Sequence, residues 1–188
     1  MIATVIAELI GNYMTTFFVV GLIVALIRTL RLHGRRDSRL VSELFLNSYI
    51  FWAIGVAEAV NFVMHSVFGN FAAATIGWAQ SPFQLELAFS SLGIAVMAFI
   101  LHGPKTQLRA KVAMVAATAV FAFGAAGGHI YQMVANHDNS VNNTGLLLVM
   151  DIVIAGVGIA LVVWHAAAIR RQDARLSDTA PSALAGIR

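Results

Sequence analysis

The sequence predicts an all-α fold, a single bundle of five transmembrane helices. Three observations lead to this prediction: the 188 residues are 59% hydrophobic, only 11% are charged, and five separate stretches are long and apolar. A soluble domain carries about 25% charged residues. A bilayer core about 30 Å thick needs about 20 apolar residues per helix. The mean hydropathy of +0.80 agrees with this class, so a soluble globular domain is excluded.

The five spans are separated by short segments rich in polar residues, glycine and proline. We expect the spans at about residues 6–28, 43–68, 83–102, 110–135 and 145–169. The N-terminus has neither a basic region nor a cleavage site with small residues, so the first span is predicted to be a retained helix rather than a signal peptide. Residues 1–169 then form one domain, and the polar tail 170–188 is expected to be disordered.

The positive charges give the predicted bundle an orientation. All twelve lysines and arginines fall in three groups that follow the first, third and fifth spans: Arg28, Arg31, Arg35, Arg36 and Arg39; Lys105, Arg109 and Lys111; Arg170, Arg171, Arg175 and Arg188. Such groups mark cytoplasmic ends, which places the N-terminus outside and the C-terminus in the cytoplasm of a bacterial inner membrane. The net charge of +3 therefore indicates topology and contact with anionic lipids, and not nucleic acid as a partner.

Few ionisable side chains fall well inside the spans, where each costs roughly 2.5–3.5 kcal/mol to insert. They are Glu58, His65, Glu86, His129 and Asp151. With a rise of about 1.5 Å per residue, His65 and Glu86 lie about 5 Å below the outer ends of their spans, and the other pair, His129 and Asp151, lies about 9 Å below. Four helices thus each contribute one ligand-type side chain to the same layer of the outer leaflet.

Two imidazoles and two carboxylates from four helices are typical of metal sites in helical bundles. Nitrogen and oxygen ligands favour Zn, Mn or Fe, and the absence of cysteine excludes thiolate ligands. No buried lysine or arginine is predicted, so a dication or protons would have to balance the carboxylates. The leading interpretation is a membrane metalloprotein with His65, Glu86, His129 and Asp151 as ligands. As an oxidoreductase or hydrolase it would use the metal to activate water or dioxygen; whether it is an enzyme stays open.

Other residues are predicted to support this site near the outer, periplasmic face. Glu58, Asn61 and His65 share one helical face through their i, i+3, i+7 spacing, which makes Glu58 a candidate proton relay. Gln132 shares a face with His129 and is a second relay candidate. Trp78 and Tyr131 are candidate cofactor contacts, with Trp78 also suited to the membrane interface.

Two alternatives stay open. His65 and His129 would also serve as the axial ligands of a b-type haem, or, together with the carboxylates, as partners of a quinone. The haem interpretation leaves Glu86 and Asp151 without a role. The second alternative is a non-catalytic bundle, or a conductor of protons or ions with Glu58 as a relay in the middle of the membrane. A chain of this size would favour a homo-oligomer or a larger membrane complex for transport.

Three segments resemble a family of small prokaryotic integral-membrane proteins of unknown function. They are MHSVFGNFAAATIGWAQSPFQLELAFSSLG (64–93), GGHIYQM (127–133) and MDIVI (150–154). The shared pattern is a histidine at a helix end, IGWxxSPFQxE, GHIYQ and an aspartate in the last helix, over about residues 40–165. The turn NSVNNTG departs from this pattern, although Asn143 and Gly145 are retained. The resemblance implies that the polar residues selected above form the family's signature, and it implies no activity.

Overall fold

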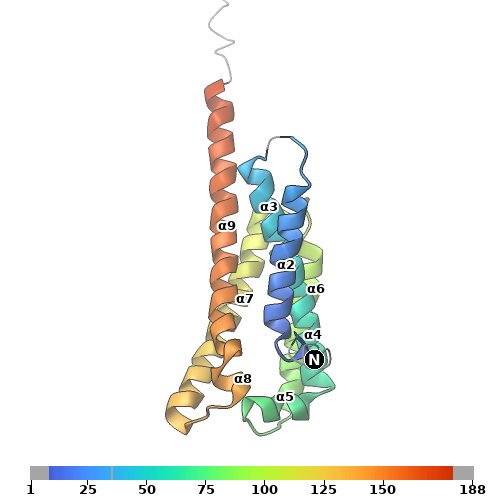
Figure 1. Ribbon diagram of the computed structural model, residues 1–188, viewed down its shortest axis with the longest axis vertical. Helices are drawn as coiled ribbons and strands as arrows, with labels where there is room; N and C mark the ends of the chain where they lie inside the picture. Colours follow the sequence, from blue (N-terminus) through green and yellow to red (C-terminus); the bar gives the residue numbers. More distant parts are fainter. Residues whose placement is uncertain (1–8, 35, 180–188) are drawn as a thin grey trace, which may run out of the picture.

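The structure, a computed structural model, describes residues 9–34 and 36–179, and within these ranges the regular elements are all helices. Five helical segments are long and apolar enough to cross a membrane: Tyr13–Leu30, Ser38–Ser66, Phe83–Leu101, Leu108–Ala135 and Val141–Asp178. They stand side by side along one axis (Figure 1). The all-α prediction is confirmed for the described residues, and the start of the first predicted span lies outside them.

The second span is not a uniform α-helix. It consists of α3 (Ser38–Ser48), the π-helical segment η1 (Tyr49–Val56) and α4 (Ala57–Ser66). The wider turns of a π-helix are rare and occur frequently at functional sites. The apolar stretch YIFWAIGV gave no sign of this segment, which separates Glu43 on α3 from Glu58 on α4.

The remaining elements are α2 (Tyr13–Leu30), α5 (Gly69–Ile76), α6 (Phe83–Leu101), α7 (Leu108–Asn136), α8 (Val141–Thr144) and α9 (Leu146–Thr179). In the packing, α4 lies against α6, and α9 lies against both α7 and α3. The short helices α5 and α8 form where the sequence predicted loops, and they contact each other at one end of the bundle (Figure 1).

The last helix is longer than predicted. It continues through Thr179, so the disorder predicted for the tail is wrong for residues 170–179, while residues 180–188 lie outside the described part. Arginine, glutamine, alanine and leucine, which are good helix formers, make up most of this extension. The side chain of Arg39 on α3 donates a 3.0 Å hydrogen bond to Gln172 Oε1, which holds the extension against the bundle.

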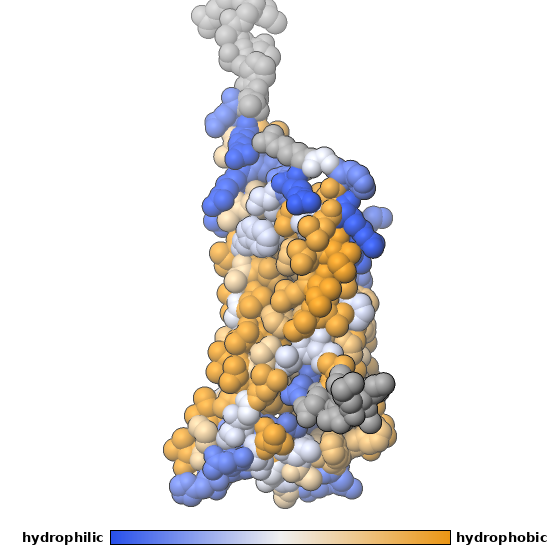
Figure 2. Space-filling model, viewed as in Figure 1, coloured by the Kyte–Doolittle hydropathy of each residue, from blue (hydrophilic) through white to orange (hydrophobic). Residues whose placement is uncertain are grey.

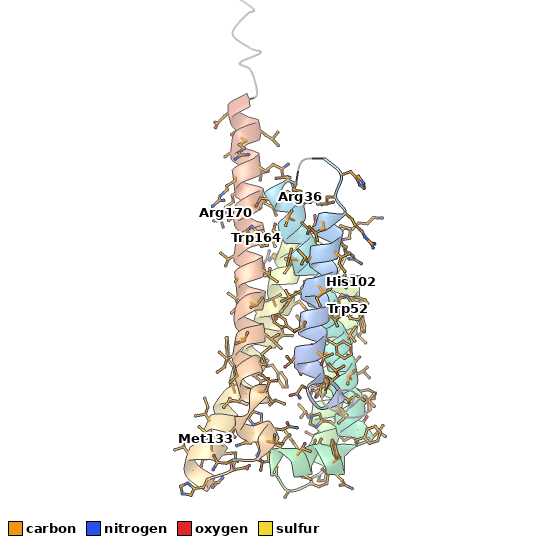
Figure 3. All side chains as sticks on the ribbon, in the orientation of Figure 1. Arg36, Trp52, His102, Met133, Trp164 and Arg170 are labelled. Atoms are coloured by element: carbon orange, nitrogen blue, oxygen red, sulfur yellow. The ribbon has the colours of Figure 1, made fainter. Side chains whose placement is uncertain are left out.

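The surface of the bundle matches a bilayer environment. A broad apolar band separates polar surfaces at the two ends (Figure 2). Large side chains in this band, such as Val120 at 74% and Ile100 at 70%, are more exposed than buried, whereas water-soluble monomers rarely expose large apolar patches. Arg36 and Arg170 lie at one end and Met133 lies at the other (Figure 3). We call the end with Arg36 and Arg170 the basic end.

The core lies between the second, fourth and fifth spans. Its fully buried members include Leu46 and Ile50 from the second span and Met114 and Val115 from α7. Leu161 of α9 completes this layer. Since these residues lie between polar clusters described below, the layer separates the two ends of the bundle.

The contact between Tyr49 and α9 depends on Gly158. The hydroxyl group of Tyr49 donates a 3.0 Å hydrogen bond to the Ile154 carbonyl oxygen. A Cβ atom on Gly158 would lie 2.4 Å from the Tyr49 hydroxyl oxygen and 2.6 Å from Cζ. Tyr49 is 4% exposed and has little room to move aside.

We therefore expect Gly158→Ala to destabilise the fold by about 1–3 kcal/mol, as overpacking of a core does. Gly156→Ala is the matched control on the same helix, because a Cβ there meets no atom within 4 Å. This control should be neutral or stabilising by up to about 1 kcal/mol through helix propensity. Thermal unfolding in detergent measures both, and equal stabilities for the two variants would contradict the packing described here.

Candidate functional site

A chain of polar side chains crosses the middle of the bundle from α2 to α6. The Tyr13 hydroxyl group donates to Asn61 Oδ1. The Asn61 amide nitrogen then donates to Ser91 Oγ at 2.8 Å and to Glu58 Oε2 at 3.3 Å. Glu58, Asn61 and Ser91 are almost fully buried. The predicted face of Glu58 and Asn61 is thus real, and each polar group in the chain has a partner.

Glu58 also lines a cavity that it shares with Asp151 of α9. The cavity has a volume of about 60 Å³ and is otherwise lined mainly by apolar side chains from α2, η1, α7 and α9. Because a water molecule needs about 10–15 Å³ of such space, the cavity has room for a few. The full lining is Met14, Tyr49, Ala53, Ile54, Glu58, Thr118, Phe121, Ala122, Ala125, Asp151, Ile154 and Ala155. We call this space the central cavity; two of its lining residues are acidic and none is basic.

His65 lies apart from this cavity, beyond the Tyr13–Asn61 contact. Its Nδ1 atom is hydrogen-bonded to Gln84 Oε1. Since an amide oxygen only accepts, Nδ1 donates this hydrogen bond. His65 and Tyr13 both line a wider space of about 640 Å³ beside α5 and α8, which we call the outer vestibule.

His129 is held in a separate group of residues at the end opposite the basic end. Its Nδ1 atom donates to Asn143 Oδ1 at 2.8 Å. The Asn143 amide nitrogen donates to the Asp138 carbonyl oxygen at 2.7 Å. The Trp78 ring lies against the imidazole at a centroid distance of 5.6 Å. We call Gly77, Trp78, His129 and residues 138–143 the His129 cap.

Gly77 allows the two loops of the His129 cap to meet. It has a φ of +87°, and a Cβ there would lie 2.2 Å from Ser140 Oγ and 2.7 Å from Asp138 Oδ1. The hydroxyl group and the backbone amide of Ser140 both hydrogen-bond Asp138 and lower the pKa of its carboxyl group below the usual 3.8. Asp138 therefore stays charged well into acid solution. Asn143 lies in the turn that departs from the family pattern, and its side chain bonds this turn to His129.

The other predicted site residues are placed away from His65 and His129 or point outward. Glu86 is exposed, because the buried face of α6 begins at Ala88 and two residues correspond to about 200° around a helix. Tyr131 is 65% exposed, and Gln132 is bonded to Asn136. Within the described residues, no three histidine, aspartate or glutamate side chains form a group that could hold a metal ion. The metal role of His65, Glu86, His129 and Asp151 stays a prediction.

A third buried polar group lies near the basic end and was not predicted. The Lys111 ammonium group is 3.7 Å from Glu43 Oε1, and the lysine side chain is only 1% exposed. His165 Nδ1 lies 2.9 Å from Ser42 Oγ, and both residues are buried. We call Ser42, Glu43, Lys111 and His165 the Lys111 cluster. It corrects the expectation that no lysine is buried, because Lys111 had been counted only with the basic group that follows the third span.

A family model described as "Family of unknown function (DUF6790)" matches residues 11–171. The chain belongs to this family. No curated protein and no solved structure matches the chain. Membership confirms the resemblance to a family of unknown function, while the prokaryotic origin stays a prediction. The matched range includes the central cavity, the His129 cap and the Lys111 cluster, so all three belong to the part of the chain that defines the family.

The Lys111–Glu43 pair gives a stability prediction. Breaking a buried pair by removing one partner costs about 3–5 kcal/mol, and we expect less than this for Lys111→Met because Glu43 is 22% exposed and partly screened by solvent. The double variant Lys111→Met with Glu43→Gln should be more stable than Lys111→Met alone, since it leaves no unpaired charge. Lys105→Met, at an exposed position, is the control. The pairing would be contradicted if the double variant loses as much stability in detergent unfolding as the single variants Lys111→Met and Glu43→Gln lose together.

Proposed function

We propose that the protein is a proton conductor of the bacterial inner membrane, in which Glu58 and Asp151 hold and pass a proton inside the bundle. The observation that carries the proposal is that both carboxyl groups line the central cavity. The five apolar spans support the membrane location. The basic residues at the ends of spans one, three and five support an orientation with the N-terminus outside.

The charge balance of the cavity favours a proton. Two ionised carboxylates on the lining of one cavity of about 60 Å³ would repel strongly in a medium of low dielectric constant. No lysine, arginine or histidine is among the lining residues. A proton on one of the two groups removes the repulsion. A carboxylic acid next to a carboxylate is then both a donor and an acceptor of protons.

A hydrogen-bonded chain links Glu58 with the outer vestibule. Tyr13 lines the vestibule and donates to Asn61, which in turn donates to Glu58. His65, whose Nδ1 atom is bonded to Gln84, lines the same vestibule. Tyr13 and Asn61 would orient Glu58, and the proton itself would move between the central cavity and the outer face through water, because a carboxamide such as Asn61 does not carry protons.

The geometry favours this function over the other predicted ones. A metal site needs several ligands around one ion, whereas among the described residues His65 and His129 are bound in different groups and Glu86 is exposed. A haem or quinone between the two histidines would have to replace the contacts that Gln84 and Trp78 make with them. Metal, haem and quinone binding, a homo-oligomer and contact with anionic lipids stay predictions.

Proton flux into liposomes tests the proposal. The purified protein is reconstituted with a pH-sensitive dye inside, and a potassium gradient with valinomycin supplies the driving voltage. We expect the wild type to acidify the interior faster than empty liposomes. Glu58→Gln and Asp151→Asn should each reduce the flux by about tenfold or more, because an amide neither accepts nor releases the proton and loss of a positioned proton-transfer group typically costs about 10²-fold or more in rate.

Asp173→Asn is the control, since it makes the same chemical change at an exposed position of α9. Its flux should equal that of the wild type. A wild-type flux no greater than that of empty liposomes, or equal flux in Glu58→Gln and wild type, would overturn the proposal.

A further inference from the structure

The Lys111 cluster shares helix faces with the central cavity. On α7, Lys111 and the cavity residue Thr118 are seven residues apart, which returns to the same face after two turns. On α9, His165 and the cavity residue Asp151 are fourteen residues apart, again a whole number of turns to within about 40°. On the second span, Glu43 and Glu58 lie on either side of η1. The same helices therefore present polar groups at two levels of the bundle.

An apolar layer separates these two levels. Leu46 and Ile50 lie between Glu43 and Glu58 along the second span, Met114 and Val115 lie between Lys111 and Thr118, and Leu161 lies between His165 and Asp151. All five belong to one buried apolar cluster. Buried side-chain atoms Asn47 Oδ1 and Ser48 Oγ, one turn beyond Glu43, have no hydrogen-bond partner among the described residues. Unpaired buried polar atoms of this kind are places where water is expected.

The contacts of Ser42 favour one tautomer of His165. The Ser42 hydroxyl oxygen lies 2.9 Å from the Arg39 carbonyl oxygen and 2.9 Å from His165 Nδ1. With its single hydrogen donated to the carbonyl oxygen, the hydroxyl oxygen accepts a hydrogen bond from Nδ1. In that tautomer Nε2 carries the lone pair, which is the arrangement of a proton acceptor.

We propose that His165 is a second proton-binding site, at the basic end, which exchanges protons between the cytoplasm and the Glu58–Asp151 cavity. This inference rests on the function proposed above. In each step a proton binds Nε2 of the neutral ring to give imidazolium and then leaves the same atom, so the ring returns to its starting form. The charged groups that act on His165 are Glu43 and Arg39 on α3 and Lys111 on α7. The Lys111–Glu43 pair adds no net charge of its own, so a proton that enters or leaves the imidazole does not leave either member of this pair without its partner.

Nuclear magnetic resonance of protein labelled with ¹⁵N in its histidines tests the site directly. His165→Gln removes and so assigns the His165 signals. We expect an Nδ1–H ring with unprotonated Nε2 at high pH, and protonation of Nε2 on acidification. A ring with hydrogen on Nε2 at high pH, or one that takes up no proton, would overturn the inference.

Proton flux separates the two proposals. In the liposome assay His165→Gln should reduce the flux by about tenfold or more, as loss of a positioned proton-transfer group does, while His33→Gln at an exposed loop position should leave it unchanged. Equal flux in His165→Gln and wild type overturns the role of His165 and leaves the cavity proposal standing. If the wild type conducts no protons but Nε2 titrates as expected, the conductor proposal fails and the proton-binding site stands.

Discussion

A polar group inside a bilayer must find a partner within the protein, and this constraint organises the whole bundle. Lipid supplies no hydrogen bonds, so an unsatisfied group costs several kcal/mol. The chain provides such partners in three places: Tyr13, Asn61 and Ser91 around Glu58, Asn143 around His129, and Glu43 with Lys111. Each of these groups joins two or more helices. The polar contacts therefore determine which helix faces meet, while the apolar contacts between them fill the space.

The fold was largely predictable because hydropathy and charge report position along the membrane normal. The five spans and the grouping of the basic residues follow from these signals alone. Three features did not: the π-helical segment Tyr49–Val56 depends on packing, α5 and α8 are too short to show a clear period, and the helical extension to Thr179 contains the charged residues that made it look like a tail.

The site was harder to predict because depth does not specify direction around a helix. Glu58 and Asn61 were found correctly, since their spacing reports one face. Glu86 shares the depth of His65 but points outward, two residues ahead of the buried face of α6. Lys111 was counted only as part of a cytoplasmic basic group because the positive-inside rule counts charges near span ends without regard to their burial. A search for acidic, basic and histidine residues at equal depth near the basic end would have found Glu43, Lys111 and His165 together.

The central claim is that Glu58 and Asp151 share one proton. Infrared spectroscopy measures this most directly, because a protonated carboxyl group has a C=O stretching band that a carboxylate lacks. At neutral pH the wild type should show such a band from this pair, and each of Glu58→Gln and Asp151→Asn should change its intensity or frequency, since each removes one of the two possible carriers. A wild-type spectrum without a protonated carboxyl band, or one that neither substitution alters, would contradict the shared proton.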